Sequence, residues 1–403
     1  MISFDPLREP TGPHAPAKQR IAATIAEARA EILELSHRIH ATPEPAFEEH
    51  RAAAWVAEVL ERHGYAVERP AGRLATAVRG RRAGGRGPDG PRIAVLAEYD
   101  ALPGLGHGCG HNTMAASGVG AAIALAAVSD ELAGEIVVLG TPAEERGSGK
   151  QLMLDDGLFE GVDAALLFHP SDRTETACIL LASEDVDVTF IGRSAHAASE
   201  PWAGLNALDA LVLLFTSIGL WRQQLPPDAR VHGIVLEAGT AANIIPDRAV
   251  GRFMVRSRDQ GRFDEMRTRF RALVDAAAMA TGTTSEAVFS GGSSTMRDNQ
   301  VLRARFAANL SALGIEDHPV REDQLGSSDM GNVSWVVPTI HPSIAICPEG
   351  VAWHSIESRD AAATPWADET TLVASTAVAQ TAYELFADPG LVEAAWREFR
   401  SGG

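Results

Sequence analysis

The chain has 403 residues, more than the roughly 250 to 300 at which a single hydrophobic core usually stops growing, so we expect two domains or one domain with a large insertion. Its apolar fraction of 45% and charged fraction of 22% are typical of a globular enzyme and exclude a disordered or collagen-like chain. The 53 acidic residues exceed the 35 Lys and Arg residues, and the formal net charge of −18 disfavours nucleic-acid and membrane partners.

The three cysteines are Cys109, Cys178 and Cys347. Their odd number and wide spacing do not indicate the disulfide framework of a small secreted protein, and they favour a cytoplasmic location. The first twenty residues are rich in proline and lack the apolar segment of a signal peptide. The most apolar stretch, residues 118–128, is shorter than the ~20 residues that span a bilayer as a helix, so it predicts a buried core helix.

Two amphipathic helices are predicted near the start of the chain, over residues 18–40 and 52–63, because apolar side chains recur there at steps of three and four. Short apolar runs then alternate with helical stretches. The predicted strands are 93–97, 136–140 and 164–168, and the predicted helices between them are 117–129 and 151–159. This alternation is typical of an α/β domain with a central, mostly parallel sheet.

A different pattern occupies the middle of the chain. A strand is followed by a helix over 206–221, two strands, a helix over 263–280 and a further strand, which is the βαββαβ order of a ferredoxin-like α+β domain. The sequence therefore predicts an inserted domain at 184–293, and a first domain formed by residues 1–183 and 294–403.

Polar side chains follow each strand of the first domain. The three strands lead into Glu98 and Asp100, into Glu144 and Glu145, and into His169. Because ligands bind at the carboxyl ends of strands in open α/β sheets, we expect these groups to converge, together with His354, which follows a late strand at 343–347. Any one of these residues could instead be a helix cap or a solvated loop residue. That alternative explains poorly why polar groups follow three successive strands.

The segment GHGCGHN adds a thiol and an imidazole. In an extended segment Cys109 and His111 point the same way, so both can face one ion. With Glu145, His169 and His354 they form a set of ligands typical of zinc and related metals, although an inert buried cysteine would explain Cys109 taken alone.

The adjacent acids Glu144 and Glu145 suit hydrolysis, because one can hold a metal while the other takes a proton from water. The structural alternative is that the two acids lie at a helix N-terminus, where their negative charges interact favourably with the helix dipole.

Six segments of the chain occur as ordered motifs: LAEYDALPGLGHGCGHN (96–112), GTPAEE (140–145), LLFHP (166–170), GRSAHAASEPWAGLNALDA (192–210), NIIPDRA (243–249) and GSSDMGNVSWVVP (326–338). Together they resemble the aminoacylase and glutamate carboxypeptidase family of dinuclear metallopeptidases, over residues 18–385. The most similar branch uses a cysteine ligand and contains aminobenzoyl-glutamate hydrolases and a dipeptidase that cleaves before basic residues.

This resemblance implies roles for single residues. Cys109 would bridge two metal ions, and Glu144 would be the general base. The remaining ligands would be His111, Glu145, His169 and His354. Asp100 would orient a histidine ligand. His196 would reach the active site of a partner subunit, while Asn243 and Arg256 would hold a carboxylate of the substrate.

The expected protein is thus a homodimer with a zinc-peptidase-like catalytic domain and an inserted lid and dimerisation domain. It would use two divalent ions, Zn or Mn with Co or Ni as alternatives, to hydrolyse the amide bond of a dipeptide or N-acyl amino acid with a free C-terminal carboxylate. The alternative is an aminobenzoyl-glutamate type of amidohydrolase. A non-catalytic relative should lack some of these ligands, and a barrel amidohydrolase needs an early His-x-His motif; the sequence meets neither condition.

Two departures from the family matter. Asn112 stands where hippurate-type hydrolases have an acid, which favours the aminobenzoyl-glutamate branch, and Glu98 replaces a histidine ligand of other branches, so its contact with metal is open. The other histidines near these motifs are assigned structural roles; they are His37, His40, His50 and His107.

Overall fold

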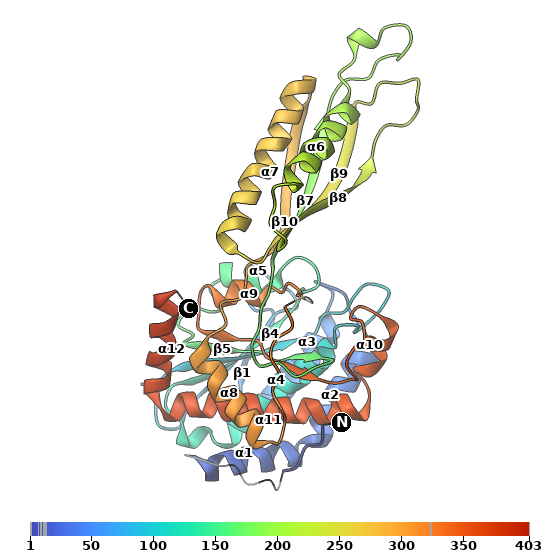
Figure 1. Ribbon diagram of the computed structural model, residues 1–403. Coiled ribbons are helices and arrows are strands. Elements are labelled where there is room, and N and C mark those ends of the chain that lie inside the picture. Colours follow the sequence, from blue (N-terminus) through green and yellow to red (C-terminus); the bar gives the residue numbers. More distant parts are fainter. Residues whose placement is uncertain (1, 7, 9, 11–13, 323–324, 403) are drawn as a thin grey trace. The chain divides into compact units, whose positions relative to one another are not determined.

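The computed structural model describes residues 2–6, 8, 10, 14–322 and 325–402 (Figure 1). Within these residues the chain forms two compact units. Unit 1 is drawn from 1–179, 296–325 and 329–403, and unit 2 from 180–295 and 326–328. The inserted domain predicted at 184–293 falls inside unit 2. The association of 326–328 with unit 2 is not evident from the sequence.

Unit 1 is built on a six-stranded sheet. In spatial order its strands are β1 (Ala66–Glu68), β2 (Val78–Ala83), β4 (Glu135–Thr141), β3 (Arg92–Glu98), β5 (Ala164–Leu166) and β11 (Thr339–Ile340). Strands β4, β3, β5 and β11 run parallel, which confirms the mostly parallel sheet. Strand β2 is antiparallel to β1 and β4 and extends the sheet at one edge. Residues 93–98 of β3 are all buried, as expected for a strand covered on both faces.

Helices surround this sheet in unit 1. They are α1 (Ala15–Glu27), α2 (Arg29–Ala41), α3 (His50–Arg62), α4 (His111–Ala127), α5 (Gly149–Asp155), α8 (Gln300–Ala312), α9 (Met330–Ser334), α10 (Ile356–Ala361), α11 (Pro365–Ala387) and α12 (Pro389–Ser401), with a 3₁₀ turn η1 (Ser129–Glu131). The helix predicted over 18–40 is two helices, separated at Ala28. Helix α4 packs directly against the sheet at Gly118. A Cβ atom at this position would come 2.2 Å from the backbone oxygen of Leu96 in β3, so only glycine allows the close approach. None of the described helices combines the length and apolar character needed to cross a membrane.

A second, two-stranded parallel sheet in unit 1 carries one of the predicted site residues. It pairs β6 (His169–Ser171) with β12 (Ser343–Ala345). The late strand predicted at 343–347 is present but ends at Ala345. It pairs with the segment that carries His169 and does not join the six-stranded sheet.

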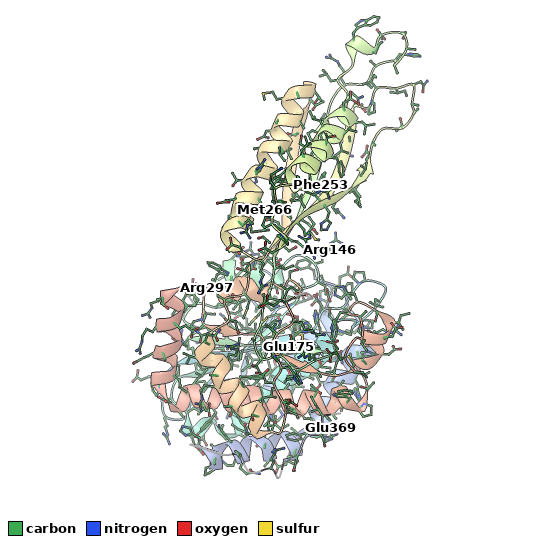
Figure 2. All side chains as sticks on the ribbon, in the orientation of Figure 1. Arg146, Glu175, Phe253, Met266, Arg297 and Glu369 are labelled. Carbon is green, nitrogen blue, oxygen red and sulfur yellow. The ribbon has the colours of Figure 1, made fainter. Side chains whose placement is uncertain are left out.

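Unit 2 has the predicted βαββαβ order. Its elements are β7 (Ala182–Ile191), η2 (Pro201–Ala203), α6 (Ala207–Arg222), β8 (Ala229–Glu237), β9 (Arg248–Ser257), α7 (Gln260–Thr281) and β10 (Thr284–Ser293). The antiparallel sheet has the order β10-β7-β9-β8, so β8 is an edge strand. Phe253 of β9 packs against Phe270 of α7, with ring centroids 5.3 Å apart, and Met266 belongs to the same core (Figure 2). Unit 2 thus has a hydrophobic core of its own.

Candidate metal centre

The carboxyl ends of neighbouring strands and the start of helix α4 bring the predicted ligands of unit 1 together. Glu98 ends β3, and Glu145 follows β4 after a short turn. The segment with Cys109 turns into α4 at Gly110, whose φ of 70° lies in the left-handed region that suits glycine. A Cβ atom there would come 2.8 Å from the side chain of Pro170, so glycine also allows the loop to approach β6.

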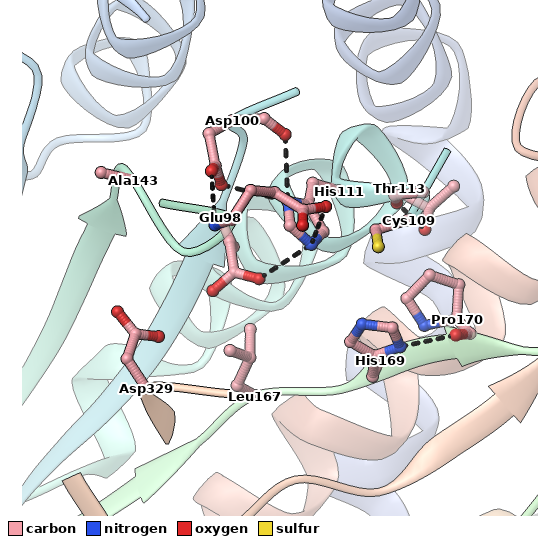
Figure 3. Close-up of polar contacts among 12 residues, drawn as sticks. Glu98, Asp100, Cys109, His111, Thr113, Ala143, Leu167, His169, Pro170 and Asp329 are labelled. Carbon is pink, nitrogen blue, oxygen red and sulfur yellow. Dashed lines mark hydrogen bonds and ion pairs between the residues drawn. The ribbon is translucent and has the colours of Figure 1, made fainter. Parts of the chain in front are cut away.

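Asp100 orients His111 and supports the turn that carries Glu145. The Nδ1 atom of His111 lies 3.0 Å from the backbone oxygen of Asp100 and 3.1 Å from its Oδ1 (Figure 3). The other carboxylate oxygen of Asp100 accepts a hydrogen bond from the backbone N–H of Glu145 at 2.9 Å. Nδ1 faces only acceptors, so it carries the proton and leaves the lone pair of Nε2 free for a metal.

The free nitrogen of His111 faces carboxylates and has no hydrogen-bond partner among the described residues. Its Nε2 lies 3.2 Å from Oε1 of Glu98 and 3.9 Å from Oε1 of Glu145, which is also buried without a partner. One atom from each of Glu98, His111 and Glu144 lies within 4.8 Å of the others. Burial lowers the pKa of His111, but the charge of Glu98 and the hydrogen bond with Asp100 raise it well above the ordinary value, so without a metal a proton on Nε2 faces these carboxylates. A divalent ion could take the place of that proton, since imidazole and carboxylates are usual ligands of such ions.

A second group contains Cys109, Glu145 and His354, whose ligand atoms also lie within 4.8 Å of one another. Nε2 of His354 is 2.9 Å from Sγ of Cys109 and 3.8 Å from Oε2 of Glu145. Burial raises the pKa of the Cys109 thiol, and the charge of Glu145 raises it further. A metal would reverse this, because a coordinating thiol loses its proton. The two groups, which are adjacent through Glu145, fit two cations.

His169 lies beside these groups without belonging to either. Its ring centroid is 6.1 Å from that of His111, and its Nδ1 contacts the backbone oxygen of Pro170 at 2.6 Å, which leaves Nε2 available. Burial lowers the pKa of His169 to about 3, so the imidazole is neutral, as a metal ligand must be. His341 packs against it with ring centroids 5.4 Å apart, although no motif in the sequence indicates this histidine.

A fully buried lysine completes the site and was not found from the sequence. Lys150 contacts Oε2 of Glu98, lies 2.6 Å from Oδ1 of Asp329, and donates its backbone N–H to Oδ2 of Asp329 at 2.8 Å. Glu98 therefore has one oxygen held by an ammonium group and the other directed at His111. Lys150 and Asp329 are 179 residues apart, so no local pattern indicates the pair.

Glu144 lies within the first group and is surrounded by acids. Burial raises its pKa well above the ordinary value, and the negative charges of Glu98 and Glu145 raise it further. Two bound cations would oppose these negative charges and favour the ionised carboxylate, which is the form that a general base requires.

The histidines assigned structural roles contact other parts of unit 1. His37 pairs with Asp368 at 2.7 Å, Nε2 of His40 lies 2.8 Å from the backbone oxygen of Arg359, and Nε2 of His107 lies 3.1 Å from that of Ile39.

The remaining predicted site residues lie in unit 2, at opposite ends of its sheet. Nδ1 of His196 accepts hydrogen bonds from the backbone N–H groups of Ala198 and Ser199, both at 3.2 Å, so its Nε2 carries the proton. Asn243 lies next to it, since its backbone oxygen accepts a hydrogen bond from Ala197. Arg256 instead lies near the far end of β9, eight residues beyond Arg248, which is about 26 Å of extended strand. Within one chain, Asn243 and Arg256 cannot hold the same carboxylate.

Comparisons with known proteins give the family of the chain. Residues 94–383 match the model of peptidase family M20/M25/M40. The chain is 37% identical to the Xaa-Arg dipeptidase of Mus musculus, covering 95% of this chain and 92% of that protein. It is 28% identical to one subunit of the p-aminobenzoyl-glutamate hydrolase of Escherichia coli, covering 92% of each.

Solved structures share the fold. An aminobenzoyl-glutamate utilization protein from Klebsiella pneumoniae has a TM-score of 0.74 at 19% identity, covering 90% of this chain and 98% of that one. A dinuclear metal binding peptidase of family M20 from Bacillus subtilis has a TM-score of 0.68 at 22% identity, covering 90% and 99%. The family and branch resemblance drawn from the six motifs is confirmed. The chain belongs to peptidase family M20/M25/M40 and is a metal-dependent hydrolase of amide or peptide bonds.

Proposed function

We propose that the protein is a dipeptidase that uses two divalent ions, Zn or Mn, to release an amino acid with a free α-carboxylate. The observation that carries this proposal is the pair of adjacent ligand groups, Glu98–His111–Glu144 and Cys109–Glu145–His354, with His169 beside them. Thiolate, imidazole and carboxylate are the ligands of such metals, with Co and Ni as alternatives.

The residues divide the work of hydrolysis. The bound cations would supply Lewis acidity and lower the pKa of water. Glu144 accepts the proton of the attacking water and delivers it to the leaving amine. Glu145 and Cys109 would hold the cations, and Asp100 keeps His111 in the tautomer that exposes Nε2. His196, whose Nε2 carries the proton, donates a hydrogen bond to the oxyanion.

The placement of Asn243 and Arg256 supports a homodimer. If both contact one substrate carboxylate they must come from different chains, because about 26 Å of strand separates their positions in one chain.

Unit 2 also exposes apolar side chains on α6 and on the edge strand β8; they are Val212, Leu213, Leu220, Ile234, Val235 and Leu236. An apolar edge strand with a neighbouring apolar helix face suits pairing between two copies. We therefore place His196 and Asn243 of one chain in the active site of its partner.

The leaving residue is proposed to be basic. The similarity to Xaa-Arg dipeptidase over most of both chains favours arginine or lysine. An aminobenzoyl-glutamate hydrolase is the second candidate, because the Escherichia coli relative is matched over similar coverage at lower identity. A cytoplasmic location is part of the same proposal, since Cys109, Cys178 and Cys347 are all free thiols.

A panel of substrates tests these proposals. Metal-depleted enzyme is reloaded with Zn²⁺ or Mn²⁺ and assayed with aminoacyl-lysine, aminoacyl-arginine, aminobenzoyl-glutamate and N-acetyl amino acids. We expect the highest kcat/KM with the basic dipeptides. Preference for aminobenzoyl-glutamate would select the second candidate, and metal-independent turnover, or no turnover of the whole panel, would exclude the proposed function.

A further inference from the structure

A buried acid from the start of the chain contacts the turn that carries the catalytic acids. Glu49 is fully buried, and its Oε1 accepts a hydrogen bond from the backbone N–H of Ala143 at 2.8 Å. Ala143 immediately precedes Glu144. The same oxygen accepts a second bond, from the backbone N–H of Phe47 at 3.0 Å.

Both of these donors have an unfavourable backbone conformation. Phe47 has a φ of 69° and Ala143 a φ of 59°, in the left-handed region that side chains other than glycine rarely adopt. Such conformations persist where surrounding contacts determine them, and they concentrate at functional sites. A single carboxylate oxygen therefore holds two strained residues, one of which sets the direction of the chain into Glu144.

Helix capping does not account for Glu49. It occupies the N-cap position of α3, but its side chain makes no capping hydrogen bond there. The first N–H groups of α3 are instead satisfied by Glu44, whose carboxylate accepts hydrogen bonds from the backbone of Arg51 and Ala52. The carboxylate of Glu49 is thus used across a separation of 94 residues.

The segment around Glu49 supports the site turns at further points. The backbone oxygen of Glu44 accepts a hydrogen bond from Ala101, the residue after Asp100, at 2.9 Å. The ring of Phe47 covers Gly147, where a Cβ atom would come 2.6 Å from the ring. Ala143 is fixed on its other side as well, because its backbone oxygen accepts a hydrogen bond from Gly149.

We propose that Glu49 is a positioning residue for catalysis: by holding the backbone of Ala143 in the left-handed conformation, it places the carboxylates of Glu144 and Glu145. The inference rests on the proposed role of Glu144 as the base. Glu49 belongs to neither ligand group, so its loss should impair turnover more than substrate affinity or metal content.

The test compares variants that move or keep the acceptor oxygen. Glu49→Asp withdraws the acceptor by one methylene group and should lower kcat by about 10- to 100-fold, as small misplacements of catalytic groups do, with KM and bound metal within about twofold of wild type. Glu49→Gln keeps an acceptor in place and should retain kcat within about threefold. The matched control is Glu48→Gln, since Glu48 is the neighbouring acid and is exposed.

A second substitution separates positioning from a general structural role. Glycine adopts the left-handed conformation without strain, so Ala143→Gly in the Glu49→Asp background should restore kcat about fivefold. Wild-type kcat in Glu49→Asp, loss of metal in parallel with activity, or no recovery in the double variant would each overturn the proposal.

Hydrogen exchange gives a readout that does not depend on activity. The amide of Ala143 should exchange slowly in the wild type and in Glu49→Gln, and at least tenfold faster in Glu49→Asp, because its acceptor is lost. Exchange in the wild-type chain as fast as in an unstructured peptide would overturn the proposal even if the aspartate variant did not fold. If the wild type hydrolysed none of the substrates, the proposed function would fail while the exchange result still decided the role of Glu49.

Discussion

The Nδ1 atom of His111 lies 3.1 Å from the carboxylate of Asp100. The second oxygen of Asp100 accepts a hydrogen bond from the backbone N–H of Glu145, so one carboxylate fixes the orientation of both His111 and Glu145. In Asp100→Asn the side chain keeps one acceptor oxygen for these two donors, and the affinity for Zn²⁺ should fall about 10- to 100-fold. Competition with a chromophoric chelator measures this affinity. Asp89→Asn, an exposed loop substitution, is the control, and equal affinities in the two variants would contradict the assignment.

The adjacent acids Glu144 and Glu145 should respond differently to the same substitution. Glu144→Gln should lose about 10²- to 10⁴-fold in kcat while keeping its metal, because it removes the base. Glu145→Gln should lose metal, since Glu145 lies within ligand distance of Cys109 and His354. Metal analysis by mass spectrometry beside steady-state kinetics decides between them. The opposite pattern would mean that the two roles are exchanged, which is worth testing because Glu144 lies close to His111.

The parts of the site that were predicted from the sequence are those linked to strand ends. Glu98, Asp100, Glu145 and His169 follow apolar runs, and a parallel sheet brings such positions to one edge whatever the details of packing. The spacing of Cys109 and His111 likewise indicated a shared direction, although His111 begins a helix rather than continuing an extended segment.

The contacts that were missed depend on tertiary packing. Lys150 contacts Asp329, and Glu49 contacts Ala143, and in both pairs the two residues are far apart in the sequence. The sequence around Lys150 and Glu49 does not distinguish them from ordinary charged residues at the surface. The sequence also does not show that Asn243 and Arg256 must come from different chains to hold one carboxylate. Their spacing in the sequence does not reveal that they lie toward opposite ends of strand β9.

The stability of the protein should depend on the protonation of Glu49. Burial raises its pKa from 4.5 to about 7, so between these values the folded state holds a proton that the unfolded state has lost. The contribution of Glu49 to the free energy of unfolding is therefore complete below pH 4.5 and decreases as pH rises to about 7, by about 1.4 kcal/mol per pH unit. In Glu49→Gln this contribution is absent. Denaturant unfolding of metal-free protein at about pH 5, 6, 7 and 8 should show the variant gaining stability relative to wild type up to about pH 7. A difference that does not change with pH would contradict the shift.

Sharing of active sites between chains predicts complementation. His196→Ala and Glu144→Gln should each be nearly inactive as homodimers, for lack of the oxyanion donor and of the base. Subunits mixed under conditions that allow exchange should form heterodimers in which one of the two sites has both residues intact, with activity recovering toward about a quarter of wild type for random assortment. Mixing two different Glu144 variants is the control, and it should restore nothing. Absence of recovery in the first mixture, with subunit exchange verified, would place His196 in the site of its own chain.

Arg256 should determine the requirement for a free carboxylate. Two arginines of the same strand have different surroundings: Arg252 forms a forked ion pair with Asp187 at 2.7 and 2.8 Å, whereas Arg256 forms no ion pair with any residue that the structure describes. The Nε atom of Arg256 lies 2.8 Å from the sulfur of Met254, which is a weak acceptor.

The guanidinium of Arg256 therefore has unused donors in the planar arrangement that matches a carboxylate. Arg256→Ala should lower kcat/KM for a dipeptide about 10- to 100-fold, the value of a hydrogen bond to a charged group, and should reduce the preference of the enzyme for the free acid over its C-terminal amide. Arg252→Ala is the matched control and should leave that preference unchanged, because its partner is already Asp187. Comparable turnover of a dipeptide and its amide by the wild type, or an unchanged preference in Arg256→Ala, would show that the carboxylate is recognised elsewhere.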